Sequence, residues 1–190
     1  MEILKERIRR DGRIKDGHII KVDSFLNHQI DIELLDEIGK EFKRLFNAED
    51  ITKVITIEAS GIAFACSVAQ YFCVPVVFAK KSASKNIDGD VYTTTITSYT
   101  RGIDYTVMLE KRFLTAEDRI LIIDDILATG KAQNGLLDIS AQAGATVCGI
   151  GVVIEKGFQG GGDKLRAAGY NLHSLAIIDS MENNTLTFRD

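Results

Sequence analysis

The chain has 190 residues, of which 45% are hydrophobic, and this is enough for one well-filled domain but too little for two. With a net charge of −4, the chain lacks the excess of basic residues that is typical of a nucleic-acid-binding protein. No apolar stretch is long enough to span a membrane. Three cysteines without Cys-x-x-Cys spacing predict buried thiols of a reduced, cytoplasmic protein, and we expect no cleaved leader. Three scattered histidines argue against a dedicated metal site.

Short apolar runs alternate with helical patterns along the chain. An apolar side predicts a short helix over residues 2–10, and apolar residues at three-to-four spacing predict a longer one over 32–46. Further helices are expected over residues 62–72, 131–143 and 163–168. Short β-branched or apolar runs predict strands over residues 18–22, 54–57, 76–79, 120–123, 146–154 and 171–178. Strands that alternate with helices build βαβ units. The sequence therefore predicts a single α/β domain, residues 1–190, with a largely parallel central sheet flanked by helices.

One segment departs from this alternation of strands and helices. Residues 91–99 and 105–109 alternate between apolar and polar side chains and are separated by Arg101-Gly102. This pattern predicts an antiparallel hairpin that projects from the main sheet.

The most informative stretch lies where the strand at residues 120–123 ends. The strand runs into the adjacent carboxylates Asp124-Asp125, and a turn of small residues follows before a helix opens at Lys131. Two adjacent carboxylates repel each other, so a helix-capping role explains them poorly. The carboxyl edge of an open α/β sheet binds ligands, and free amides at a helix start attract phosphate. This combination suits a ribose 5-phosphate. Ala132 stands where a triphosphate-binding P-loop needs Ser or Thr.

Three further strand ends carry small or charged residues. Glu58-Ala59-Ser60-Gly61 forms a turn whose backbone amides can approach an anion closely. Glu155-Lys156-Gly157-Phe158 offers an ammonium group for a ring oxygen and an aromatic side chain to cover a planar base. Lys80-Lys81 adds positive charge suited to a pyrophosphate. Each segment alone also fits an ordinary turn or a solvated strand end, so their coincidence at one sheet edge carries the argument.

These residues resemble the signature of a known enzyme family. Asp124-Asp125, two linking residues and the run Ala128 to Ala132 are similar to the ribose-phosphate motif of the type I phosphoribosyltransferases. The similarity extends along the whole chain to bacterial xanthine phosphoribosyltransferases, through residues 21–31, 58–63, 75–79 and 149–156.

The resemblance implies a role for each loop around phosphoribosyl pyrophosphate (PRPP). Asp124 and Asp125 are expected to be the catalytic acids, which address the ribose hydroxyls. The 5-phosphate is expected on Ala128, Thr129, Gly130, Lys131 and Ala132. The pyrophosphate is expected on Glu58, Ala59, Ser60 and Gly61, with Lys80 and Lys81 nearby. The purine pocket is expected to contain Ile20, Asn27, Lys156 and Phe158.

The resemblance also implies the surroundings of this site. Residues 1–31 and 155–190 would form a hood, and residues 82–111 would form a flexible loop that closes over the substrate. Mg²⁺ would be bound through PRPP, with no direct protein ligand. A homodimer is expected, in which Ile19 or Phe25 could face the partner, without a nucleic-acid or membrane partner.

The reaction that this resemblance implies is transfer of the 5-phosphoribosyl group from PRPP to N9 of xanthine, which gives xanthosine 5′-monophosphate and pyrophosphate. Asn27 and Lys156 would distinguish a 2-oxo, 6-oxo base from adenine. Two alternatives stay open. The base could be guanine or hypoxanthine, or the chain could be a PRPP-sensing transcriptional regulator of the same fold, which would need a DNA-binding module.

Overall fold

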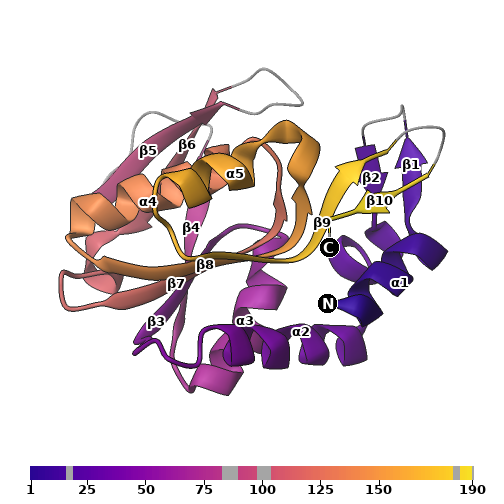
Figure 1. Cartoon of the computed structure of the whole chain (residues 1–190). Coiled ribbons are helices and arrows are strands. Elements are labelled where there is room, and N and C mark those ends of the chain that lie inside the picture. Colours follow the sequence, from indigo (N-terminus) through magenta and orange to yellow (C-terminus); the bar gives the residue numbers. More distant parts are fainter. Residues whose placement is uncertain (16–18, 83–89, 98–103, 182–184, 190) are drawn as a thin grey trace.

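The structure is a computed structural model that describes residues 1–15, 19–82, 90–97, 104–181 and 185–189. Its centre is an eight-stranded sheet with the strand order β10-β9-β8-β7-β3-β4-β6-β5 (Figure 1). The five middle strands are parallel: β3 (Lys53–Ile57), β4 (Val76–Ser82), β7 (Arg119–Leu127), β8 (Thr146–Lys156) and β9 (Leu172–Ser180). The predicted largely parallel α/β sheet is therefore confirmed.

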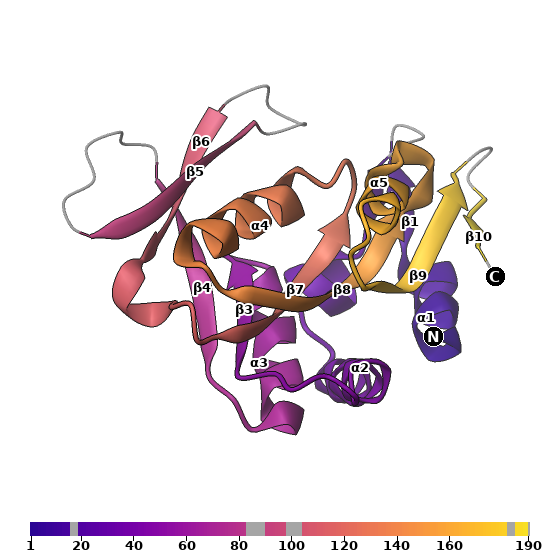
Figure 2. The ribbon, with the colours of Figure 1, turned by 60° about the vertical axis from the view of Figure 1, so that its left-hand side comes forward.

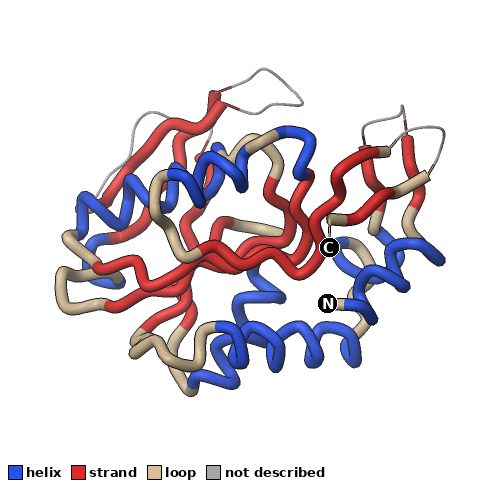
Figure 3. Tube along the Cα trace, in the orientation of Figure 1, coloured by secondary structure: helices blue, strands red, loops and turns tan. Residues whose placement is uncertain are grey.

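Helices cover both faces of this sheet (Figures 2 and 3). Two of them, α2 (Ile32–Leu45) and α3 (Gly61–Phe72), pack on one face, and α4 (Lys131–Ala143) and α5 (Gly161–Ala167) lie on the other. The buried apolar side chains accordingly form two clusters, one on each side of the sheet. Strands enclosed on both faces consist of continuous apolar runs, and this is why the sequence identified them.

Antiparallel strands extend the sheet at both edges. The strands β5 (Val91–Thr97) and β6 (Asp104–Glu110) pair with each other, and β6 also pairs with β4, so that Lys80 lies opposite Met108. These two strands therefore continue the main sheet at its edge. Residues 98–103 and 83–89 lie outside the described residues, so the predicted flexible loop over residues 82–111 stays a prediction.

The N-terminal segment packs beside the last strands of the chain, at one side edge of the sheet (Figure 1). It contains α1 (Glu2–Asp11), the antiparallel pair β1 (Arg13–Lys15) and β2 (Ile19–Lys21), and a π-helical turn (Asp23–Asn27). The Met1 amino group donates to the Leu175 carbonyl oxygen at 2.7 Å, and Lys5 Nζ donates to the Arg189 carbonyl oxygen at 3.1 Å. These contacts tie the two ends of the chain together next to β10 (Thr187–Phe188). That residues 1–31 and 155–190 form a hood over a substrate stays a prediction.

Several details differ from the sequence-based expectations. β7 continues through Asp124-Asp125 to Leu127, because its backbone pairs with β8 along that length. The sequence did not indicate β1 and β10, which are only three and two residues long. Cys66 and Cys73 are exposed, so the prediction of three buried thiols is wrong for these two, although all three cysteines are free.

Two further expectations concern the surface of the molecule. Phe25 is 0% exposed and belongs to the core, so the idea that it faces a partner is wrong. In the described part of the chain, the helices are too short or too polar to cross a membrane.

Candidate functional site

Asp124 lies on β7 at the carboxyl edge of the sheet, and its side chain is held by two hydrogen bonds. Gln133 Nε2 donates to Asp124 Oδ2 at 2.7 Å, and the backbone N–H of Asp125 donates to Asp124 Oδ1 at 3.0 Å. Asp124 is only 6% exposed, and Gln133, in the first turn of α4, is also buried. The carboxylate is therefore fixed in orientation below the surface, whereas Asp125 is half-exposed.

The electrostatics of this acid pair are unusual. Burial, followed by the neighbouring carboxylate of Asp125, raises the pKa of Asp124 well above its ordinary value of 3.8, and Lys81 opposes this effect. Two adjacent carboxylates, one of them buried, favour a bound proton or cation. A strongly perturbed acid in this place is typical of a functional site.

Gly61 brings the first turn of α3 directly against this acid. A Cβ atom on Gly61 would overlap Thr56 Oγ1 and would lie 3.1 Å from Asp124 Oδ1. These distances place the Glu58–Gly61 turn beside the carboxylate, and only glycine fits at position 61. Thr56 is completely buried, and its Oγ1 has no hydrogen-bond partner among the described residues. The structure thus brings together two of the segments that the sequence singled out, Asp124-Asp125 and Glu58–Gly61.

The turn between β7 and α4 is shaped by Gly130, whose φ of 85° is left-handed and favours glycine. The helix begins at Lys131, and the backbone N–H of Asn134 donates to the Gly130 carbonyl oxygen at 2.9 Å. The first amides of a helix have no partner within that helix and can bind an anion. This helix start therefore suits a phosphate, while Lys131 is exposed.

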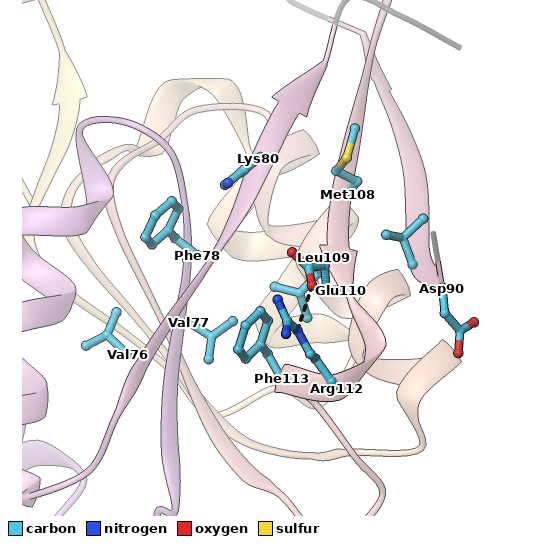
Figure 4. Close-up of a pocket in the computed structure, with 11 residues that line it drawn as sticks. Val76, Val77, Phe78, Lys80, Asp90, Met108, Leu109, Glu110, Arg112 and Phe113 are labelled. Carbon is cyan, nitrogen blue, oxygen red and sulfur yellow. Dashed lines mark ion pairs between the residues drawn. The ribbon is translucent and has the colours of Figure 1, made fainter. Parts of the chain in front are cut away.

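Lys80 and Lys81 point to opposite faces of β4, as neighbouring residues of a strand do. The Lys81 backbone N–H donates to Glu58 Oε1 at 2.7 Å, and Lys81 Nζ lies 5.4 Å from the centre of the Tyr105 ring. Lys80 instead lines a groove on the other face, together with Phe78 and Met108 (Figure 4). Lys81 is therefore on the side of Asp124, and Lys80 is not.

The residues expected around a purine lie in three places. Asn27 lines a pocket of about 380 Å³ together with Ala59 and Ser60 of the turn that precedes α3. Its Oδ1 atom is buried and has no hydrogen-bond partner among the described residues. Ile20 is 5% exposed and belongs to the hydrophobic core, so its side chain contributes to packing.

The third place is the end of β8. Lys156 is half-buried, and this burial lowers the pKa of its ammonium group. Phe158 follows on a short 3-10 turn (Gly157–Gln159) and is exposed. A partly desolvated ammonium and an open aromatic face are suited to a planar ligand with carbonyl oxygens. Their contact with such a ligand stays a prediction.

Sequence reasoning missed Gln133 and Thr56, which surround the buried acid. Both are polar residues at positions that face the core, and this mismatch with the apolar pattern was the available signal. The described residues contain no group of three His, Cys, Asp or Glu side chains arranged to hold a metal ion. The arrangement offers instead hydrogen-bonding acids beside two amide-rich turns.

Comparisons with known proteins show the family of the chain. The phosphoribosyl transferase domain matches residues 22–166. A xanthine phosphoribosyltransferase from Lachnoclostridium phytofermentans is 61% identical over 100% of this chain and 98% of its own. One from Ruminiclostridium cellulolyticum is 55% identical, with 100% of both chains covered. An adenine phosphoribosyltransferase structure from Rhodothermus marinus has a TM-score of 0.75 at 22% identity, covers 94% of this chain and 100% of its own, and shows the same fold. The chain therefore belongs to the phosphoribosyltransferase family, within the group of bacterial xanthine phosphoribosyltransferases.

Proposed function

We propose that the chain transfers the 5-phosphoribosyl group of PRPP to N9 of xanthine, which yields xanthosine 5′-monophosphate and pyrophosphate. The names of the full-length relatives support this activity. The buried Oδ1 of Asn27 supports an oxopurine over adenine, because a buried acceptor without a partner among the described residues suits a ring N–H group of the six-membered ring. Xanthine has such groups beside its carbonyl oxygens, and the pocket of Asn27 adjoins the turn proposed for pyrophosphate.

Each loop has a distinct part in the proposed reaction. The amides of Ala128 to Ala132 and the Thr129 hydroxyl hold the 5-phosphate, and Asp124 and Asp125 bind the ribose hydroxyls. The Glu58–Gly61 turn and Lys81 bind the pyrophosphate, with Lys156 and Phe158 on the base. Breaking the bond between C1 of the ribose and pyrophosphate places positive charge on the sugar and negative charge on the leaving group. Fixed amides and Lys81 stabilise the leaving group, and alignment of the base accelerates its attack.

Mg²⁺ fits this arrangement as a companion of PRPP. Carboxylate oxygens suit this ion, and Asp124-Asp125 supplies them at the ribose, where they can act through water. Bound to PRPP, the ion would neutralise charge on the departing pyrophosphate. The buried, hydrogen-bonded Asp124 contributes orientation of the ribose hydroxyls in this proposal.

A panel of bases tests the proposed activity. The purified chain is mixed with PRPP and Mg²⁺, and pyrophosphate release is measured with xanthine, guanine, hypoxanthine, adenine and uracil. We expect the highest kcat/KM with xanthine. A preference for guanine, hypoxanthine or adenine would overturn the choice of base, and no release with any base would overturn the activity. A gel-shift measurement with duplex DNA examines the regulator alternative.

A matched pair of lysine variants tests the base site. Lys156→Met keeps most of the apolar stem but removes the charge, and we expect the KM for xanthine to rise by about tenfold, as for loss of a charged hydrogen bond. Lys164→Met, at an exposed position of α5, should leave it unchanged. Equal KM values for both variants would remove Lys156 from the base site.

We also propose that the chain acts as a homodimer in the cytoplasm. The three free cysteines are consistent with a reducing compartment. The groove of Figure 4 has a volume of about 930 Å³ and carries the exposed aromatic side chains of Phe78 and Phe113. Exposed apolar patches of this kind favour association with another protein surface. We take a second copy of this chain as the occupant.

A further inference from the structure

We infer that the ion pair between the buried Glu155 and the partly exposed Arg166 is a positioning device for the 5-phosphate loop. It acts through the first residues of α5, and neither side chain needs to touch the substrate. This inference rests on the proposed phosphate site at residues 128–132, and it adds residues that the proposed reaction does not use.

The first step is the contact between α5 and the loop. A Cβ atom on Gly161 would overlap the Ala128 carbonyl oxygen and would lie 2.6 Å from the backbone nitrogen of Gly130. The main chain at the start of α5 is therefore packed directly on the peptide groups of the loop. A shift of α5 would move those peptide groups or leave a gap behind them.

The second step is the anchoring of α5 itself. Glu155 is 0% exposed, and Arg166 Nη1 and Nη2 donate to its two carboxylate oxygens at 3.0 and 2.7 Å. Ser174 Oγ, on β9, donates to the same carboxylate. A Cβ atom on Gly162 would overlap Glu155 Oε1, so the backbone of α5 lies against this carboxylate as well. Arg166 at one end and Gly162 at the other thus hold the helix on Glu155.

The third step links this anchor to the sheet. Glu155 on β8 pairs in register with Leu127 on β7, the residue that immediately precedes the loop. The loop is thereby fixed from two sides, by the strand that leads into it and by the helix that covers it. Lys156, proposed for the base, follows Glu155 directly.

The physical reason for an ion pair here is directional. A guanidinium that donates two bonds to a carboxylate fixes both distance and angle, which an apolar contact cannot do. Amides that bind a phosphate must be held within a fraction of an ångström, and small displacements weaken binding strongly. Burying the Glu155 carboxylate costs desolvation, and its pairing with Arg166 can offset this cost and specify one arrangement. We assign that role to Glu155 and Arg166.

Binding of two ligands to variants tests the inference. Arg166→Lys keeps the charge but loses the two-pronged geometry, and Gly161→Ala introduces the overlap with the loop. For both, we expect the dissociation constant of ribose 5-phosphate, measured by calorimetry, to rise by about tenfold or more. The dissociation constant of magnesium pyrophosphate, which the Glu58–Gly61 turn would bind, should change by less than about twofold. A general loosening of the fold would instead weaken the binding of both ligands alike.

Gly160→Ala is the matched control for Gly161→Ala. A Cβ atom on Gly160 meets no atom within 4 Å, so this variant tests only the strain at its φ of 70°. Thermal unfolding verifies that each variant is folded. Unchanged ribose 5-phosphate binding in Arg166→Lys and Gly161→Ala, or an equal loss of both ligands, would overturn the inference. Absence of ribose 5-phosphate binding to the wild-type chain would overturn it too. A chain that binds ribose 5-phosphate as expected but ignores xanthine would refute only the proposed function.

Discussion

The Gln133 carboxamide donates a 2.7 Å hydrogen bond to Oδ2 of Asp124, and both side chains are buried where β7 meets the first turn of α4. This bond joins the proposed catalytic residue Asp124 to the helix whose start is proposed to bind the 5-phosphate. The orientation of the carboxylate and the position of the phosphate loop are therefore coupled through one neutral donor. A neutral donor holds the acid without cancelling its charge.

Replacing Gln133 with Met should weaken catalysis while the substrate-contacting residues remain in place. We expect kcat to fall by about tenfold, because Asp124 loses its orientation. Loss of a bond to the charged form also favours protonation, so the acidic limb of the pH profile of kcat should move to higher pH. Unfolding should become easier by about 1–3 kcal/mol.

Gln70→Met, on the exposed face of α3, is the control for this change. It should leave kcat and the pH profile unaltered. If Gln133→Met showed the same acidic limb as the wild type, Gln133 would have no influence on the protonation of Asp124. Chemical denaturation supplies the free energy of unfolding for all three proteins.

Asp124→Asn should lose activity by about a hundredfold and yet be more stable than the wild type at neutral pH. Burial and the Asp125 carboxylate raise the pKa of Asp124 above 3.8, so the native chain binds this proton more tightly than the unfolded chain. Its contribution to stability is fully present below pH 3.8 and is lost as the pH rises through the native pKa. An asparagine side chain stays neutral at all pH values, so the variant does not lose this stability as the pH rises. The Gln133 amide can rotate and hydrogen-bond to the new asparagine.

Melting temperatures measured across pH test this prediction. The advantage of Asp124→Asn should be present at pH 7 and should disappear on acidification toward the ordinary pKa of an aspartate. Asp138→Asn, at an exposed position on α4, changes the net charge equally and should give no such advantage. A wild-type protein that is the more stable of the two at pH 7 would contradict the raised pKa of Asp124.

Gly61→Ala should disturb the acid and the pyrophosphate turn together. The new Cβ atom would overlap Thr56 Oγ1 and approach Asp124 Oδ1, so we expect a destabilisation of about 1–3 kcal/mol and a large loss of kcat. Thr56→Ala removes the overlapped oxygen. The double variant should therefore regain part of the lost stability relative to Gly61→Ala, and a double-mutant cycle measures this coupling. Additive effects would show that the two residues do not compete for space.

The sequence predicted the elements of the core because their patterns are local. The buried runs of β7 and β8 and the periodic apolar face of α2 are determined by burial, and burial is visible in residue type. The ends of elements were less predictable, because they depend on partners distant in sequence. β4 reaches Ser82 since its last residues pair with β6, which no local pattern of β4 records.

The candidate site follows the same division. Asp124-Asp125 and the Gly130 turn could be predicted, since a strand end followed by a small-residue turn has a local signature. The contacts of Gln133 with Asp124 and of Arg166 with Glu155 could not, because each contact depends on three-dimensional packing. The separation of Lys80 from Lys81 follows from strand alternation, but it required knowledge of which face of β4 meets the acid.

Phe113→Asp should convert the proposed dimer into monomers. Phe113 is 44% exposed in the groove of Figure 4, beside the ion pair of Glu110 and Arg112 at 2.7 Å. A carboxylate buried there in an interface would be desolvated without a partner, and truncation of an aromatic anchor commonly costs 2 kcal/mol or more, about thirtyfold in the dissociation constant.

Light scattering should give about twice 21.0 kDa for the wild type and a single chain mass for dilute Phe113→Asp. Ile32→Asp introduces the same charge at a 69% exposed position outside the groove and should remain dimeric. A dimer that persists in Phe113→Asp but is lost in Ile32→Asp would move the interface to α2, and a wild-type mass of one chain would refute the dimer altogether.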